Sequence, residues 1–274
     1  MCCVTIKINS ETAGKFMTES ILNRLPQTLL DSEIPKIALV AGASGGIGQA
    51  FCRQLAQQFP EIMLIRLAHR VDALESLPVA TQDIAFDLED EASIETAIAT
   101  LDKNIGLDWV FIATGWLHDD HFQPEKTFRS LSAAQLSRSF QLNAVGPSIL
   151  IKALMARVNA KHPLRIGILT ARVGSISDNR LGGWHSYRAS KAALNMLIKN
   201  FAIEFERMKK DVVIVGLQPG TTDTGLSAPF QRGVSPENLQ TPEYTSSQLL
   251  KVMQVIKAED SGHLYDFLGL HFDP

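Results

Sequence analysis

The stretch Ile37-Ala-Leu-Val-Ala-Gly-Ala-Ser-Gly-Gly-Ile-Gly48 decides the fold. Its apolar first half predicts a buried strand, and the amphipathic pattern from Ile47 to Phe59 predicts a helix. Between them, Gly42 allows a sharp turn, Gly46 allows a pyrophosphate to approach the backbone, and Gly48 allows tight packing of helix on strand. The free N–H groups of such a turn bind phosphate at the positive end of the helix. A plain glycine turn is the alternative, because three residues separate the first two glycines, unlike the broad G-x-G-x-x-G fingerprint.

Short apolar runs and longer amphipathic stretches alternate over the rest of the chain. Further strands are predicted at Ile62–Leu67, Asp83–Phe86, Leu107–Ala113, Arg165–Thr170, Val212–Leu217 and His263–Tyr265. Further helices are predicted at Glu91–Leu101, Ala133–Asn159, Ser186–Lys209 and Thr245–Lys257. Strands that alternate with helices indicate a parallel sheet covered on both faces. We therefore expect one doubly wound, Rossmann-type α/β domain over residues 35–274, with about seven strands in a mostly parallel sheet.

Composition excludes several classes of protein. The chain has 274 residues, of which 45% are hydrophobic, and a formal net charge of −3. This balance gives neither the self-repulsion of a disordered chain nor the basic surface that binds nucleic acid. No apolar run approaches the roughly 20 residues that cross a bilayer, so we expect no contact with the membrane interior. Cys2, Cys3 and Cys52 form no disulfide framework and favour a cytoplasmic location.

Residues 1–34 differ from the rest in pattern. Charged residues interrupt the apolar ones, so this segment lacks the unbroken apolar centre of a secretory signal. We expect an N-terminal extension that is flexible or loosely docked on the domain. A dimer arm and a short regulatory segment are the alternatives.

The end of the second predicted strand indicates which cofactor is preferred. An Asp or Glu about 20 residues after the glycine turn accepts hydrogen bonds from the ribose of NAD. Here the run is Arg66-Leu-Ala-His-Arg70, with no acidic residue before Asp72. His69 and Arg70 suit a 2′-phosphate, so NADP(H) is preferred over NAD(H). Solvated loop cations are the alternative.

Tyr187 and Lys191 form the candidate catalytic pair. They are four residues apart in a strongly helical stretch, so both side chains leave the same helix face. A tyrosine phenol titrates near pH 10, and lowering its pKa by about three units takes roughly 4 kcal/mol. A nearby ammonium and the positive charge of an oxidised nicotinamide favour the phenolate in this way. A chance pair of surface residues is the alternative, and the glycine turn upstream argues against it.

These motifs resemble the short-chain dehydrogenase/reductase family over about residues 36–272. Asp87 and the N–H of Leu88 match the site where the family binds adenine. Asn143 matches the helix residue that anchors a water chain to the catalytic Lys. The turn from Pro219 to Thr224 matches the one that contacts nicotinamide and phosphate. The stretches 114–119, 174–184 and 261–266 are similar to the C-factor-like and sniffer-like carbonyl reductases within the family.

The resemblance implies hydride transfer between a nicotinamide and a carbonyl or alcohol substrate. Tyr187 exchanges the proton of the substrate oxygen, Lys191 lowers the pKa of that phenol, and Asn143 positions a water relay. With the two cations after the second strand, the expected cofactor-binding residues are Gly42, Ser44, Gly46, Ile47, Gly48, His69, Arg70, Asp87, Leu88, Gly115, Tyr187, Lys191, Pro219, Gly220, Thr222 and Thr224.

The sequence departs from the family pattern at two places. The fourth strand ends in Ile-Ala-Thr-Gly115, where the family has Asn-Asn-Ala-Gly. The slot of the catalytic serine falls on Ala171, whereas Ser175 lies twelve residues before Tyr187, close to the usual distance. We expect Ser175 to donate the hydrogen bond to the substrate oxygen. Ser177 and Thr170 are further candidates, and a turn hydroxyl is the other role open to Ser175.

The remaining features concern the substrate side and the assembly. His118-Asp-Asp-His121 is expected to be a polar loop at the rim of the active site, with no metal bound. Trp184 and His185 line the substrate pocket or pack against a loop, and Pro147 kinks its helix. Residues 225–243 occupy the place of the family's substrate lid, and their mixed character indicates no single substrate class. We expect a small or medium carbonyl compound. The resemblance also implies a homodimer or homotetramer.

Two functions follow from the sequence. The first is an NADPH-dependent carbonyl reductase. The second is a cofactor-binding regulatory or signalling protein with little turnover, suggested by the displaced serine and the altered end of the fourth strand. The intact pair of Tyr187 and Lys191 argues for the enzyme.

Overall fold

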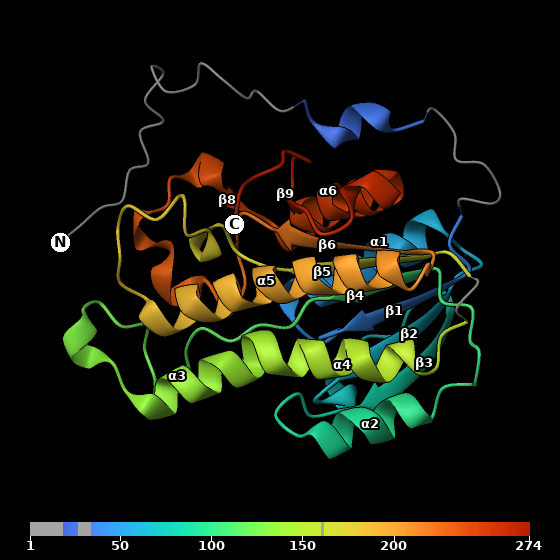
Figure 1. Ribbon diagram of the computed structural model, residues 1–274, viewed down its shortest axis with the longest axis horizontal. Coiled ribbons are helices and arrows are strands. Elements are labelled where there is room, and N and C mark those ends of the chain that lie inside the picture. The colour runs from blue at the N-terminus through green and yellow to red at the C-terminus, as the bar shows by residue number, and fades with distance from the viewer. Residues whose placement is uncertain (1–18, 27–33, 160–161) are drawn as a thin grey trace.

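The computed structural model describes residues 19–26, 34–159 and 162–274 and centres on one seven-stranded sheet. Its strand order is β3-β2-β1-β4-β5-β6-β9, and every neighbouring pair is parallel. The strands are β1 Ile37–Ala41, β2 Met63–Ala68, β3 Ala80–Ala85, β4 Trp109–Ile112, β5 Leu164–Leu169, β6 Val212–Gln218 and β9 Leu264–Asp266. The order in which successive strands are added to the sheet reverses between β1 and β4, which gives the sheet its switch point. The predicted doubly wound α/β fold is confirmed (Figure 1).

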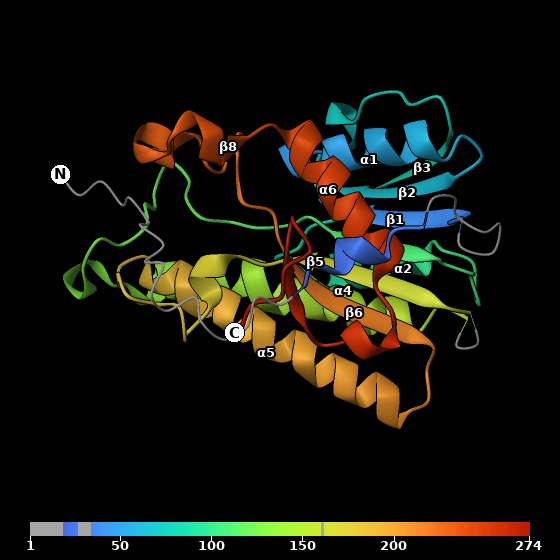
Figure 2. The same ribbon diagram turned by 90° about the horizontal axis from the view of Figure 1, so that it is seen from above.

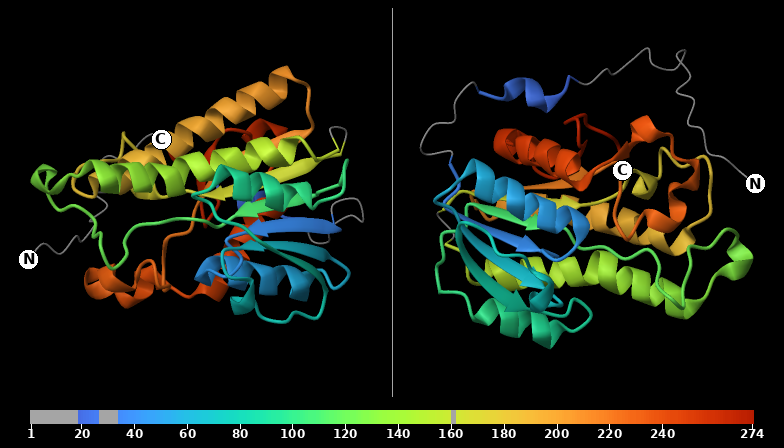
Figure 3. Two further views of the ribbon diagram at one scale, coloured as in Figure 1. Left: turned by 90° about the horizontal axis from the view of Figure 1, so that it is seen from below. Right: turned by 180° about the vertical axis from the view of Figure 1, so that it is seen from behind.

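Helices cover both faces of this sheet. They are α1 Gly46–Gln58, α2 Glu91–Ala99, α3 Ala133–Phe140, α4 Gly146–Met155, α5 His185–Arg207 and α6 Pro242–Val255. Figure 2 shows α1 and α6 on one side of the sheet and α5 on the other. Figure 3 places α2 and α4 on the side of α5. The inner strands therefore bury both of their faces, which explains why they are apolar runs without alternation, whereas the edge strand β3 is mostly exposed.

Two apolar cores result, one on each side of the sheet. Leu39 and Ile65 belong to the core under α2, α4 and α5, and Val40 belongs to the core under α1 and α6. In the second core the rings of Phe51 and Phe111 stack at 3.8 Å between centroids. These cores fix α1 and α5 against the ends of β1 and β5, where the predicted site residues lie.

The predicted helix Ala133–Asn159 is in fact two helices. A π-helical turn, η5 Gln141–Val145, separates α3 from α4. Pro147 lies in the first turn of α4 and has no N–H to donate to the π-helical turn before it. The expected distortion at Pro147 is therefore present, and it falls beside Asn143.

Short elements complete the chain. A two-stranded parallel sheet joins β7 Thr221–Thr222 to β8 Leu239–Gln240. The short 3-10 helices are η1 Ile21–Arg24, η3 Val71–Ala73, η4 Phe128–Ser130, η6 Arg172–Gly174, η7 Ala228–Gly233, η8 Pro236–Asn238 and η9 Ala258–Asp260. Among the residues described, no helix is both long and apolar enough to span a membrane.

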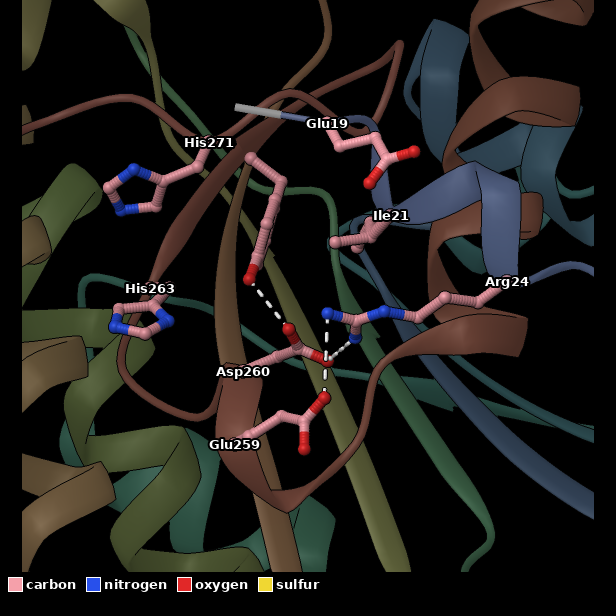
Figure 4. Close-up of a pocket in the computed structure, with 8 residues that line it drawn as sticks. Glu19, Ile21, Arg24, Glu259, Asp260, His263 and His271 are labelled. Carbon is pink, nitrogen blue, oxygen red and sulfur yellow. Dashed lines mark hydrogen bonds and ion pairs between the residues drawn. The ribbon is translucent and has the colours of Figure 1, made fainter. Parts of the chain in front are cut away.

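Part of the N-terminal extension is docked on the C-terminal end of the domain. The N–H of Ile21 donates to the carbonyl of Gly269 at 3.0 Å, and Ile21 is buried. The guanidinium of Arg24 donates to Asp260 at 2.7 Å, and the Tyr265 hydroxyl donates to the same carboxylate at 2.7 Å. Figure 4 shows Ile21, Arg24 and Asp260 at a cavity of about 340 Å³. The flexible extension expected over residues 1–34 otherwise falls mostly outside the described residues.

Candidate active site

Steric contacts explain the glycines of the turn after β1. Gly42 has a φ of +79°, which is a left-handed conformation that favours glycine. A Cβ atom on Gly48 would lie 2.2 Å from the carbonyl oxygen of Gly42, so only glycine allows this approach of helix and turn. A Cβ atom on Gly46 would lie 2.7 Å from the side chain of Thr224. The turn is thus more constrained than a plain glycine loop.

The first turn of α1 offers unpaired N–H groups. Its N-cap, Gly45, has no side chain to accept them, and the first helical bond runs from Gln49 to the Gly45 carbonyl at 2.8 Å. The N–H groups of Gly46, Ile47 and Gly48 therefore have no helical acceptor. Three such groups at the positive end of a thirteen-residue helix fit a pyrophosphate.

The end of β4 lies directly against this turn. The Ala113 N–H donates to the Ala41 carbonyl at 2.8 Å, and the Thr114 hydroxyl is buried without a hydrogen-bond partner. A Cβ atom on Gly115 would lie 3.6 Å from Lys191 Nζ. The altered motif therefore keeps the backbone close to both the glycine turn and α5, and the orphaned hydroxyl leaves one donor for a bound group.

The cationic residues near the end of β2 differ in burial. Arg66 is buried and binds Asp83 through two bonds of 2.7 Å, so it is a structural residue. His69 and Arg70 are exposed, and their side chains form no hydrogen bond or ion pair with any described residue. They remain free to meet a phosphate.

Asp87 and Leu88 follow β3. The Asp87 carboxylate accepts the N–H of Glu89 at 2.9 Å, and the Asp87 N–H donates to Ser93 Oγ at 2.9 Å. Leu88 packs so closely on Gly146 of α4 that a Cβ atom there would lie 2.4 Å from its side chain. These bonds hold the Asp87 carboxylate at the same edge of the sheet as the glycine turn.

The turn after β6 contacts both α6 and the glycine turn. The Thr222 hydroxyl is buried, 3.2 Å from the Pro219 carbonyl and 2.9 Å from the Thr245 hydroxyl of α6. The side chain of Thr224 instead lies against Gly46. Gly220, with a φ of +74°, makes the bend that precedes both threonines. Of the two predicted threonine contacts, Thr224 faces the glycine turn, whereas the hydroxyl of Thr222 is used within the fold.

The predicted catalytic pair lies in the first two turns of α5. Lys191 is 2% exposed, and its Nζ donates to the Leu169 carbonyl at the end of β5 at 2.9 Å. That Nζ lies 5.9 Å from the centre of the Tyr187 ring. Both side chains therefore share one face of the helix, as their spacing predicts.

The pKa of the Tyr187 phenol in the protein alone moves opposite to the direction predicted for the site with an oxidised nicotinamide, and that prediction stands for the cofactor-bound site. Burial raises the pKa of Tyr187 above its ordinary value, because desolvation disfavours the phenolate. Burial also lowers the pKa of Lys191 to about 8. The ammonium donates to a backbone carbonyl, so its attraction for the phenolate does not outweigh desolvation.

Asn143 lies at the centre of a buried polar network. It accepts the Trp116 N–H at 2.7 Å and donates to the Trp116 carbonyl at 2.8 Å. It also donates to the hydroxyls of Ser139 and Ser190, at 3.2 and 3.1 Å. The amide thus clamps the loop after β4 to α5, and the π-helical turn aims it inward.

The serine candidates differ in their contacts. Thr170 donates to buried Asn195 at 2.5 Å, which directs its hydroxyl into the fold. Ser175 is 1% exposed, accepts the Asp178 N–H at 3.2 Å and lies 3.1 Å from the exposed Ser177 hydroxyl. Its neighbour Gly174 contacts α5, since a Cβ atom there would lie 2.8 Å from Lys191 Cβ. Ser175 is therefore beside the catalytic helix, with its hydroxyl engaged in a turn.

A series of aromatic rings in contact runs from Tyr187 to His118. The Trp184 ring lies 6.3 Å from that of Tyr187 and 5.1 Å from that of Phe230, and Phe230 lies 5.3 Å from His118. His118 also contacts the Leu226 carbonyl at 3.2 Å. The predicted rim loop and lid are thus in contact. In the part of the chain that the structure describes, no group of three His, Cys, Asp or Glu is placed to hold a metal.

Sequence reasoning missed the side chains behind the catalytic helix. Ser139 and Ser190 had a detectable signal, because they lie four residues before Asn143 and three after Tyr187 on helices. Glu125, whose buried carboxyl group contacts Ser186, had none, since 61 residues separate the two.

Comparison with known proteins identifies the class. The family model described as short chain dehydrogenase matches residues 36–234. The chain therefore belongs to the short-chain dehydrogenase family, and it is an NAD(P)-dependent oxidoreductase acting on CH–OH or C=O groups. It is 32% identical over 227 residues to 1-hydroxy-2-glutathionyl-2-methyl-3-butene dehydrogenase of Rhodococcus sp. (strain AD45), covering 82% of this chain and 93% of that protein.

Further relatives support the predicted branch of the family. C-signal of Myxococcus xanthus is 29% identical over 136 residues, covering 50% of this chain and 76% of that protein. NADPH-bound carbonyl reductase from chicken fatty liver has a TM-score of 0.75 at 23% identity, and carbonyl reductase Sniffer of D. melanogaster has 0.74 at 19%. Both structures cover 87% of this chain and are 99% covered by it, which shows a shared fold. The resemblance to C-factor-like and sniffer-like members is confirmed.

Proposed function

We propose that the protein is an NADPH-dependent carbonyl reductase. The observation that carries this proposal is the placement of Lys191 and Tyr187 on one face of α5, with Gly115 and the end of β4 packed against the Lys191 ammonium. The glycine turn and its uncapped helix lie at the same edge of the sheet, so one dinucleotide can reach both.

The residues of the site fit such a cofactor. The N–H groups of Gly46, Ile47 and Gly48, together with Ser44, hold the pyrophosphate at the start of α1. Asp87 and the Leu88 N–H hold adenine. Pro219, Gly220 and Thr224 close the nicotinamide side, where Thr224 lies on Gly46. Thr222 supports this turn through Thr245.

Each catalytic side chain has a defined task. The cofactor, when bound, supplies the hydride that reduces the carbonyl carbon. Tyr187 donates its phenol proton to the carbonyl oxygen, and Lys191 then returns a proton to the Tyr187 phenolate. Asn143 keeps the loop after β4 in place beside that proton path. Ser175 donates a hydrogen bond to the substrate oxygen as negative charge develops there.

NADPH is the proposed cofactor because the free cations after β2 match its phosphate. Arg70 forms forked bonds with a 2′-phosphate, and His69 adds a second donor. The chicken carbonyl reductase of the same fold is described as NADPH-bound. The substrate is a small or medium carbonyl compound that enters beside the rings of Trp184 and Phe230.

A regulatory protein with little turnover is the second candidate. The observation that favours it is the Ser175 hydroxyl, which is buried and engaged with Asp178. In this case the chain binds NADPH tightly and reduces no carbonyl compound at an appreciable rate.

We also propose a cytoplasmic homodimer or homotetramer. The proposed location rests on Cys2, Cys3 and Cys52, whose odd number and adjacent pair form no disulfide framework. The proposed assembly rests on the exposed apolar residues Met196 and Ile203, which are seven residues apart on α5 and share one face.

The test follows NADPH absorbance while the purified protein is offered aldehydes, ketones and quinones, with NADPH binding measured separately. Turnover with any of these compounds supports the reductase. Tight NADPH binding without turnover supports the regulatory candidate, and failure to bind either NADPH or NADH contradicts both.

A further inference from the structure

A buried carboxyl group holds the start of the catalytic helix. Glu125, in the loop after β4, is 2% exposed. Its Oε2 accepts the Ser186 N–H at 3.2 Å, and its Oε1 accepts the Ser186 hydroxyl. Its backbone carbonyl accepts the Trp184 N–H at 2.5 Å. No described basic side chain forms an ion pair with Glu125. The cost of burying this carboxyl group is therefore offset mainly by its hydrogen bonds to Ser186 of α5.

The local backbone explains why α5 needs this partner. Its N-cap, Trp184, has a left-handed φ of 49° and provides no side-chain hydrogen bond to the helix. The first N–H groups of a helix have no internal acceptor, and the positive helix end favours a carboxyl group there. Glu125 therefore supplies from a distant loop the cap that the residue before the helix lacks.

The capped residue is the immediate neighbour of Tyr187. All three polar groups of Ser186 are engaged, because its carbonyl also accepts the Ser139 hydroxyl at 3.1 Å. On the other side, the Ser190 hydroxyl donates to the Tyr187 carbonyl at 2.9 Å. The Tyr187 phenol itself bonds to no described residue. Its position therefore depends on the backbone that these buried groups hold.

The loop that carries Glu125 is fixed to α3. The Arg138 guanidinium donates to Asp119 at 2.7 Å, and the Gln135 amide donates to the Gln123 carbonyl at 2.8 Å. The carboxyl group thus reaches Ser186 from a rigid support.

We propose that Glu125 is a positioning residue, which acts through Ser186 to aim the Tyr187 phenol at the substrate oxygen. This inference rests on the proposed function, since it concerns the same reaction. It adds a residue that the sequence motifs of the site do not contain.

The kinetic test compares four variants with the wild type. Glu125→Ala removes both bonds to Ser186, and we expect kcat to fall about 100-fold, the effect of a displacement near 1 Å. The KM for NADPH stays within about twofold, because the glycine turn is unaffected. Glu125→Gln keeps an acceptor for the Ser186 N–H and recovers most of the rate. Ser186→Ala removes one bond only, folds more readily, and loses about fivefold.

Asp108→Ala is the matched control. Asp108 also accepts two backbone N–H bonds, from Lys36 at 2.7 Å and Ile37 at 2.8 Å, but it lies where the strands begin. We expect this variant to lower thermal stability and leave kcat unchanged. An equal loss of kcat in both alanine variants would show that Glu125 acts through stability alone.

A titration that needs no turnover separates this inference from the proposed function. The chain has three tyrosines. The phenolate absorbance of the wild type, or of a variant, minus that of the same protein carrying Tyr187→Phe is therefore the signal of Tyr187. The charged groups around the start of α5 are Arg188 and Lys191 on the helix and Glu125 from the loop. Because burial raises the Tyr187 pKa, we expect Glu125→Ala to move it down towards its ordinary value near 10.

The outcomes are distinct. A wild type without turnover contradicts the proposed function, and the titration then decides the role of Glu125. The inference is overturned if the Glu125→Ala variant folds and shows an unchanged kcat and an unchanged Tyr187 titration. Where Glu125→Ala does not fold, the same two results for Ser186→Ala overturn it.

Discussion

The glycine turn after β1 and the first turn of α5 meet the same edge of the sheet, and they are held in different ways. The glycine turn is shaped by contacts of main-chain atoms, as at Gly48, where a Cβ atom would lie 2.2 Å from the Gly42 carbonyl. The first turn of α5 is held by buried side chains from two other segments, Glu125 of the loop after β4 and Ser139 of α3. A site for phosphate can thus be built from backbone alone, whereas a reactive phenol requires a surrounding network.

The largest effect should appear at the catalytic helix, where an ammonium is buried. The pKa of Lys191 is about 8 in the folded protein, below the ordinary 10.5 of the unfolded chain. Between these values the unfolded chain holds the proton and the folded protein has lost it, so stability rises with pH. From pH 8 to pH 10 we expect a gain of about 2 kcal/mol for the wild type relative to Lys191→Met.

Chemical denaturation of both proteins at several pH values measures this gain. A difference that stays constant from pH 8 to pH 10 would mean that the Lys191 ammonium is solvated.

A smaller effect is expected at the glycine turn. Gly46→Ala places a methyl group 2.7 Å from the Thr224 side chain, in the path of the pyrophosphate. We expect NADPH binding to weaken about tenfold, which is about 1.4 kcal/mol. Adding Thr224→Ser removes the opposing methyl group and should restore part of the affinity. Calorimetry on the single and double variants checks this, and equal affinities for the two would contradict steric control by Thr224.

The smallest effect concerns the choice of cofactor. Arg70 is exposed, so its contact with a 2′-phosphate is partly screened by solvent. We expect Arg70→Ala to weaken NADPH binding about fivefold and to leave NADH binding unchanged. Fluorescence titration with each cofactor tests this. Equal weakening of both would exclude a phosphate contact and leave Arg70 as a solvated cation.

The same contrast explains which features of the site could be predicted from the sequence. Gly42, Gly46 and Gly48 are visible as a motif because one backbone geometry demands one residue type. Tyr187 and Lys191 are visible because helical periodicity brings residues four apart together. The division into α3 and α4 was not predicted, because Pro147 is the one sequence signal that accompanies the π-helical turn.

Tertiary contacts account for the remaining differences. Glu125 and Ser186 come together through the fold, and nothing local marks them. The direction of the Tyr187 pKa depends on burial, which spacing along a helix does not specify. Likewise, Thr222 resembles a cofactor ligand in sequence, yet its hydroxyl contacts Thr245.

Single-turnover hydride transfer by Tyr187→Phe tests the central claim most directly. The variant is mixed with saturating NADPH and a carbonyl substrate that the wild type reduces, and NADPH binding is measured in parallel. The phenyl ring keeps the packing of the phenol and removes its proton, so we predict a rate at least about 1,000-fold lower with NADPH affinity unchanged. A rate within about tenfold of the wild type would contradict the assignment of Tyr187 as the proton donor.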